Sequence, residues 1–213
     1  VSPSYEGQNR EANKLTKSLN KAGIPILFLI YLTIAFTFRS YTQPLLLMIM
    51  VPISLTAVAW GHWIHDFPIN IISLLGIIAL IGIMVNDGLV LIGRFNTNLK
   101  EGMPFDTALL EAGKSRFRAI FLTSVTTIAG LAPLLLEKSR QAQFLKPMAI
   151  SIAYGIGFAT LLTLVLLPVF LSFNNNLKTT VKWLWSGNMP TKESVERALL
   201  EVQEAKDLEG DTH

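Results

Sequence analysis

A neighbouring amide and carboxyl group, Asn86 and Asp87, are the residues best placed for chemistry, because they lie within the apolar segment GIMVNDGLVLIG. An aspartate near the centre of a membrane helix costs about 2.5–3.5 kcal/mol on insertion scales. The surrounding isoleucine, leucine and valine residues can offset this cost, but they do not account for the acid. A carboxyl group can bind and release a proton, and intramembrane acids commonly mark proton relays. The pair therefore predicts a proton-carrying site; the alternative is a pair that only hydrogen-bonds neighbouring helices.

The segment HWIHD offers a second set of polar side chains, His62, His65 and Asp66, whose spacing could ligate a metal ion. This segment lies in a short loop between two apolar stretches, where histidine and tryptophan commonly anchor a helix at the membrane interface. We therefore predict no metal site. The sequence contains no cysteine, which excludes disulfide bonds and cysteine metal sites.

Membrane helices must position these residues. The chain is 51% hydrophobic and 15% charged, with a mean hydropathy of +0.45, values typical of a membrane protein. About 20 apolar residues span a bilayer, and five stretches are predicted to do so: residues 24–38, 44–63, 69–93, 117–136 and 147–173. The net charge of +3 is small and spread along the chain, so nothing indicates a nucleic-acid partner.

Five spans place the two ends of the chain on opposite sides of the membrane. Lys and Arg number seven on the side of the N-terminus and eleven on the other, so we expect the N-terminus outside and the C-terminus in the cytoplasm. The predicted regions are residues 1–21 as a lead-in from an extracytoplasmic domain, a transmembrane domain 22–173 and a cytoplasmic tail 174–213. Residues 96–115 are expected to form a cytoplasmic connector with one amphipathic helix, FDTALLEAG, at the interface.

Small residues in the third stretch should let other helices approach closely. The candidates are Gly76, Gly82, Gly88 and Gly93. Helical spacing places Asp87 roughly on the face of Gly76, and that face should point at protein because lipid cannot satisfy a polar group.

A threonine-rich patch in the fourth stretch is a candidate partner of the acid. If Arg94 and Arg118 both lie at the cytoplasmic boundary, the rise of 1.5 Å per residue puts Asp87 about 10 Å deep and Thr123 about 7.5 Å deep. The matched depth favours a contact between them, although such hydroxyl groups often bond to their own helix.

Several consecutive strings resemble one family of transporters. IGIMVNDGLVLIGRFNTNLKEG and ALLEAGKSRFRAIFLTSVTTIAGLAPLLL closely resemble the tenth and eleventh membrane helices of resistance–nodulation–division (RND) transporters of the AcrB-like branch. FRSYTQPLLLMIMVPISLTA resembles the join of the eighth and ninth helices, YGIGFATLLTLVLLPVF the twelfth, and SYEGQNREANK the end of the porter domain. The resemblance covers about Ser4 to Phe173. It implies an all-α membrane protein: the last five helices of a twelve-helix bundle. Because no signal peptide precedes Val1, a partial chain or a processed product is expected.

The resemblance also implies site residues. In AcrB-like pumps a lysine of the tenth helix meets an acidic pair from the first half of the polypeptide. Asn86 occupies the lysine position here, and Asp87 occupies the next position, which is usually an amide. An arginine and a threonine of the eleventh helix match Arg116 and Thr123. The predicted proton relay is therefore Asp87, Asn86, Thr123 and Arg116, in which Asp87 replaces the lysine; alternatively, the relay rests on carboxylates outside this chain.

The implied function is export of drugs or other small molecules by proton antiport across the bacterial inner membrane, with a periplasmic N-terminus and no enzymatic activity. Protons are the coupling ion and no cofactor is expected. The implied partners are the bilayer, the remainder of the polypeptide, two further copies in a homotrimer, a periplasmic adaptor and an outer-membrane channel. A Sec-type translocation subunit of the same superfamily and a non-transporting scaffold or degenerate half-pump are the alternatives. Metal-ion exporters are a third, although the six methionines are scattered.

Overall fold

The computed structural model describes residues 21, 25, 28–187, 190–200 and 202–203. A short apolar helix, Phe28–Phe38, comes first. The longer elements that follow are α2 (Thr42–Ile64), α3 (Ile71–Lys100), α4 (Phe105–Leu136), α5 (Arg140–Leu161) and α6 (Leu167–Ser186). A π-helical turn, Leu162–Leu166, joins α5 to α6, and a 3-10 turn, Glu193–Val195, lies in the tail. Across these described residues, every regular element is helical.

Four helices are long and apolar enough to cross a membrane: α2, α3, α4 and the combined helix that runs from Arg140 to Trp185. This confirms the prediction of an all-α membrane protein with several spans. The first of the five predicted spans, residues 24–38, coincides with the Phe28–Phe38 helix, but some of its residues lie outside the described part of the chain. The described part of the chain therefore has four long apolar helices, where the sequence predicted five spans.

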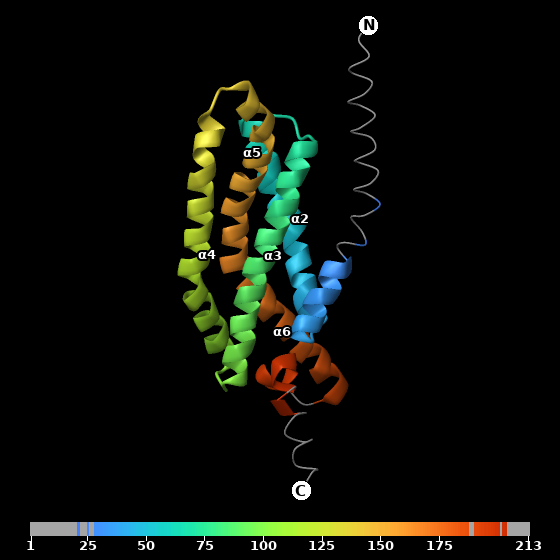
Figure 1. Ribbon diagram of the computed structural model, residues 1–213. Helices are drawn as coiled ribbons and strands as arrows, with labels where there is room; N and C mark the ends of the chain where they lie inside the picture. The colour runs from blue at the N-terminus through green and yellow to red at the C-terminus, as the bar shows by residue number, and fades with distance from the viewer. Residues whose placement is uncertain (1–20, 22–24, 26–27, 188–189, 201, 204–213) are drawn as a thin grey trace.

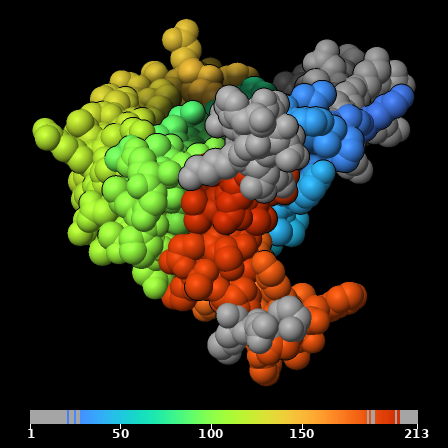
Figure 2. Space-filling view, turned by 90° about the horizontal axis from the view of Figure 1, so that it is seen from below, coloured from blue at the N-terminus to red at the C-terminus, as the bar shows by residue number. Residues whose placement is uncertain are grey.

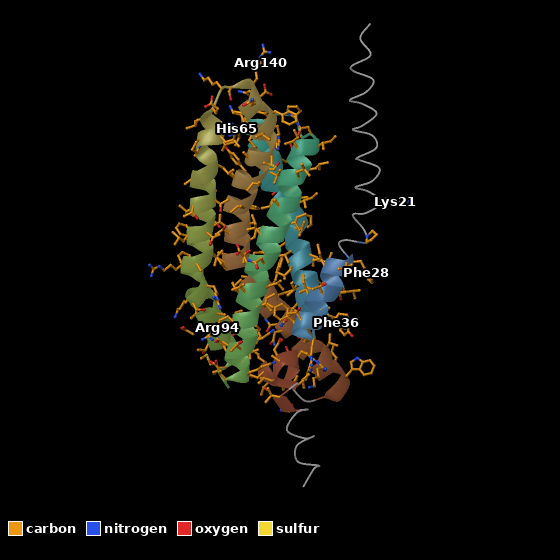
Figure 3. All side chains as sticks on the ribbon, viewed as in Figure 1. Lys21, Phe28, Phe36, His65, Arg94 and Arg140 are labelled. Atoms are coloured by element: carbon orange, nitrogen blue, oxygen red, sulfur yellow. The ribbon has the colours of Figure 1, made fainter. Side chains whose placement is uncertain are left out.

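The helices run alternately up and down and lie side by side (Figure 1). The α2–α3 and α4–α5 connections lie at one end of the bundle, called the upper end here. The corner before α2 and the α3–α4 turn lie at the opposite, lower end. Arg140 and His65 are at the upper end and Arg94 is at the lower end (Figure 3).

α5 is the centre of the packing and lies against α2, α3 and α4. Its buried residues are largely small, such as Ala149, Ala153 and Gly155, and small residues let neighbouring helices approach closely in membranes. Leu80 of α3 shows the result, since its side chain packs directly over Gly155. The leucine is fully buried.

The structure shows the segment FDTALLEAG as helical, but the connection between the two helices is shorter than the predicted residues 96–115. Residues 96–100 continue α3, and residues 105–115 are the first turns of α4, so only residues 101–104 connect the two helices. The polar residues that suggested a loop serve as contacts between helices. The Asn98 amide donates a hydrogen bond of 3.0 Å to the Ala108 carbonyl of α4, while Asn96 exchanges two hydrogen bonds, of 3.0 and 3.2 Å, with Gln43 of α2.

The π-helical turn before α6 has a local cause in the sequence. Pro168 carries no N–H group, so it cannot donate to the Leu164 carbonyl four residues earlier. The backbone adjusts by widening one turn, and the Leu167 N–H bonds to the Leu162 carbonyl five residues back. Such turns let a helix change course without ending, and α6 continues from here to the lower end (Figure 1).

The tail segment, residues 191–200, folds back against the lower end, beside α3 and near the Phe28–Phe38 helix (Figure 2). The carboxylate of Glu193 accepts a hydrogen bond of 3.0 Å from the backbone N–H of Phe105, the first residue of α4. The Lys192 ammonium forms an ion pair of 2.8 Å with Asp106. Ala198 joins the buried core. These contacts hold the start of α4 in place.

Candidate functional site

Asn86 and Asp87 lie near the middle of α3, a helix of 30 residues. The start of this helix is firmly set, because the side chain of Asn70 accepts hydrogen bonds from the N–H groups of Ile72 and Ser73. The Ser73 hydroxyl accepts one in return from the Asn70 N–H, which completes a capping box. The helix therefore carries the pair at a defined depth within the bundle.

One face of α3 is left uncovered by the described residues of the chain. We call this the open face and define it by the residues that are exposed along it at helical spacing: Leu75, Ile78, Gly82, Asn86 and Val90. Leu75 and Ile78 are each 53% exposed. A Cβ atom built at Gly82 meets no other atom within 4 Å. The open face is apolar apart from Asn86 at its centre.

Asp87 lies at the border between the open face and the packed face of α3. Its side chain is half-buried, whereas Met84 and Gly88 on either side of it are buried. Among the described residues, none forms a hydrogen bond or an ion pair with the Asp87 carboxyl group. The carboxyl group is therefore available to groups that approach from the open face, and its chemistry is reversible protonation.

The other two predicted relay residues lie on α4 and do not contact the pair. The Thr123 hydroxyl is exposed and donates a hydrogen bond of 2.8 Å to the Ala119 carbonyl of its own helix. Arg116 is half-buried, and its Nε has no hydrogen-bond partner within the described part of the chain. In that part, no hydrogen bond or ion pair joins any two of Asn86, Asp87, Arg116 and Thr123.

The four glycines predicted for helix packing have different surroundings. A Cβ at Gly76 would lie 2.7 Å from the Met148 carbonyl oxygen of α5, and one at Gly88 would overlap the Leu47 side chain of α2. Gly93 is in ordinary contact with Phe38, at 3.8 Å. Gly82 lies on the open face and contacts none of the described helices.

The histidines at the upper end bond to protein groups. His62 is buried, and its ring nitrogens lie 3.0 Å from the Phe67 carbonyl oxygen and 3.0 Å from the Ser151 hydroxyl. His65 Nε2 lies 3.1 Å from the Tyr154 hydroxyl. In the described residues, no group of three or more His, Cys, Asp or Glu side chains is arranged to hold a metal ion.

Two buried polar contacts were not predicted from the sequence. The hydroxyls of Ser124 and Thr160 bond to each other between α4 and α5. In the tail, the buried carboxylate of Glu196 accepts a hydrogen bond of 2.7 Å from the Asn175 amide and pairs with Lys178 at 3.5 Å. Each residue looks like an ordinary helix or tail residue in isolation.

The helices are long enough to cross a membrane and pack closely at glycines, which defines a multi-pass membrane protein. Its helix bundle leaves one face of α3, beside the Asp87 carboxyl group, open to further helices. Residues 1–174 match the AcrB/AcrD/AcrF family. The chain therefore belongs to this family, the RND efflux transporters. Family membership also supports the prediction that it is not an enzyme.

Individual relatives agree with the family match. The swarming motility protein SwrC of Bacillus subtilis (strain 168) is 31% identical over 159 residues, which are 74% of this chain and 15% of SwrC. The cobalt-zinc-cadmium resistance protein CzcA of Cupriavidus metallidurans is 29% identical over 147 residues, 68% of this chain and 14% of CzcA. The multidrug resistance protein MdtC of Erwinia amylovora is 27% identical over 155 residues, 72% of this chain and 15% of MdtC.

A solved structure shares the fold. The crystal structure of a heavy metal efflux pump superimposes with a TM-score of 0.67 and 25% sequence identity, covering 79% of this chain and 17% of that one. The chain thus spans about one seventh of the length of SwrC, CzcA and MdtC. The likeness agrees with the all-α membrane fold.

Proposed function

We propose that the chain supplies the last membrane helices of a proton-antiporting RND exporter in the bacterial inner membrane. The N-terminus then lies in the periplasm, and the lower end of the bundle faces the cytoplasm. The single observation that carries this proposal is the position of Asp87, a carboxyl group in mid-membrane beside an open face that no described helix covers. The family match favours an exporter over a Sec-type translocation subunit.

The open face supports a role for the remainder of the polypeptide. Lipid cannot satisfy an amide and a carboxyl group in mid-membrane, so other helices must cover Asn86 and Asp87. We place the first half of the pump on this face, with its acidic groups next to Asp87. Asn86 then orients the carboxyl group, and Thr123 and Arg116 shape the hydrogen-bonding network where α4 meets the incoming helices.

Transport follows from a change of charge at Asp87. Protonation from the periplasm removes a negative charge at the contact between the two halves of the pump, and release to the cytoplasm restores it. Because a charge in mid-membrane costs several kcal/mol more than its neutral form, the two states favour different helix positions. Helix movement then drives the porter domains, where substrate binds, and trimerisation brings three such units to an adaptor and an outer-membrane channel.

The substrate class belongs to regions outside this chain. MdtC is named for multidrug resistance, whereas CzcA is named for resistance to cobalt, zinc and cadmium. We therefore propose drugs or other small molecules as the substrates, with metal ions as the second candidate. Cells that depend on the full-length pump should be tested for growth with drugs and with these metals. If the pump protects the cells against drugs only, or against metals only, that class is the substrate.

The coupling role of Asp87 is tested in proteoliposomes. The Asp87→Asn variant of the full-length pump keeps the shape of the side chain but cannot carry a proton, so export driven by a pH gradient should fall to the level of empty liposomes. Asp87→Glu should retain a measurable rate, and Val90→Ala on the same open face is the matched control. The proposal would be wrong if Asp87→Asn exports as fast as the parent pump. It would also be wrong if neither the parent nor the variant carries protons.

A further inference from the structure

The last part of α6, residues 174–186, continues beyond the hydrocarbon core of a bilayer. The helix that runs from Arg140 to Trp185 has 46 residues, about 69 Å at 1.5 Å per residue, whereas the core is about 30 Å thick. Three consecutive asparagines at residues 174–176 follow the apolar part of α6. They mark the exit of the helix on the lower side, because polar side chains are costly at mid-membrane depth. We call residues 174–186 the helix end.

One side of the helix end is fixed against the tail segment. Asn175 is fully buried, and its amide donates hydrogen bonds of 2.8 Å to the Lys192 carbonyl and 2.7 Å to the Glu196 carboxylate. Lys178, one turn further on, pairs with the same carboxylate at 3.5 Å. The tail segment therefore sets which way the helix end faces.

The opposite side of the helix end is apolar and exposed, and we call it the apolar face. At 3.6 residues per turn, the residues that lie across the helix from Asn175 are 49%, 56% and 70% exposed: Leu177, Val181 and Leu184. Exposed apolar side chains recur at every fourth residue along α6, at Val169, Phe173, Leu177, Val181 and Trp185. The apolar face thus continues the exposed apolar surface of the membrane-spanning part without a break.

The direction of the helix end differs from that of the bundle. Seen from below, along the bundle, the helix end projects sideways from the other helices (Figure 2). A helix that projects sideways in this view runs across the bundle, and therefore along the membrane surface. The π-helical turn at Leu162–Leu166 lies between the start of the combined helix and this end, and such turns let a helix change course.

We propose that the helix end lies flat at the membrane–water interface, with its apolar face among the acyl chains beneath the headgroups and the tail segment on its water side. Amphipathic helices in this position bury their apolar face about 5–10 Å deep. Trp183 and Trp185 belong to the residue type that is enriched at this depth. Continuity with the membrane-spanning part of α6 favours lipid over a protein partner as the occupant of the apolar face.

The inference concerns a part of the chain outside the family match, which ends at residue 174. It requires only that the bundle crosses a membrane, and it takes nothing from proton transport.

The test measures the depth of nitroxide labels in the full-length pump, otherwise free of cysteine, in liposomes. Leu177→Cys and Leu184→Cys lie on one side of the helix, about 10 Å apart along its axis. A flat helix should give both labels the same ratio of accessibility to dissolved oxygen over a water-soluble nickel complex, and both should favour oxygen. Thr191→Cys, at an exposed position in the tail segment, is the matched control and should favour the nickel complex.

Two results would overturn the proposal. A weaker preference for oxygen at Leu184→Cys than at Leu177→Cys would show that the helix end leaves the membrane for the water. Low accessibility of both labels to both reagents would show that a protein, either a partner or a second copy, covers the apolar face.

A second measurement leaves the apolar residues at 177 and 184 in place. Lipids brominated near the headgroup end of their acyl chains should quench the tryptophan fluorescence of the parent pump more than that of Trp185→Phe. Equal quenching of the two proteins would contradict the proposal. Because neither experiment measures protons or substrate, failure here is distinct from failure of the transport mechanism.

Discussion

At residue 87 a carboxyl group lies half-buried in a helix long enough to cross a bilayer, with no partner among the described residues. Membrane proteins usually keep such groups where other helices or water meet them. Asn86, one position earlier, points to the open face, which makes an amide the first group that an incoming helix encounters. We propose that the two side chains together form the centre of a contact with further helices.

His62 represents a different use of a polar side chain, because the bundle satisfies both of its ring nitrogens. His62→Phe should destabilise the bundle by about 1–3 kcal/mol, since the buried Ser151 hydroxyl and the partly buried Phe67 carbonyl each lose their hydrogen bond to the ring. The melting temperature of the purified pump should fall accordingly. His65→Phe is the control: His65 is exposed, so its loss should stay within about 0.5 kcal/mol. Equal melting temperatures for both variants would show that His62 is not a structural anchor.

Helix positions could largely be predicted from hydropathy, whereas helix ends could not. The second span was predicted over residues 44–63, and α2 covers Thr42–Ile64. The α3–α4 connection was predicted too long because Asn96 and Asn98 are polar. Their side chains bond to Gln43 and to the Ala108 carbonyl, and such long-range partners leave no periodic signal in the local sequence.

The candidate site could likewise be predicted from the sequence only in part. The depth of Asp87 follows from local sequence, since it depends only on the position of the residue in an apolar run. Its surroundings do not, because they depend on helices that approach the open face. Matched depth favoured a contact with Thr123, but the structure shows that hydroxyl bonded to the Ala119 carbonyl of its own helix, the common arrangement for threonine in a membrane helix.

A glycine substitution in α3, with a second one in α4 as its control, tests how closely α3 and α5 pack. Gly76→Ala should destabilise the bundle by about 1–3 kcal/mol, because the new methyl group would lie 2.7 Å from the Met148 carbonyl oxygen, a backbone atom that cannot turn aside. Gly113→Ala in α4 meets no neighbour within 4 Å and should be neutral or stabilising by up to about 1 kcal/mol. Thermal melting of the two variants measures the difference. A Gly76→Ala pump that melts with the parent would contradict this packing.

On the scale of the whole molecule, the chain matches only about one seventh of the length of SwrC, CzcA and MdtC, which agrees with a chain that forms one part of a larger bundle. Asp87, at the border of the open face of α3, is the only carboxyl group near the middle of a membrane-length helix among the described residues, whereas the opposite face of α3 packs against α2 and α5.

Coverage of the open face can be measured in the assembled pump. A nitroxide label at Gly82→Cys should be poorly accessible both to oxygen dissolved in the bilayer and to a water-soluble nickel complex, because protein surrounds it. This chain has no cysteine of its own, so labelling requires only that the remainder of the pump be cysteine-free. High accessibility to oxygen would mean that the open face meets lipid, which is incompatible with the proposed relay.

The most direct test of the account is the infrared difference spectrum of the full-length pump between acidic and alkaline buffer. We expect a carbonyl band from a protonated carboxylic acid that loses a component in Asp87→Asn and keeps it in Val90→Ala. An identical band in the parent and in Asp87→Asn would show that Asp87 does not change its protonation, and the transport mechanism would then be wrong.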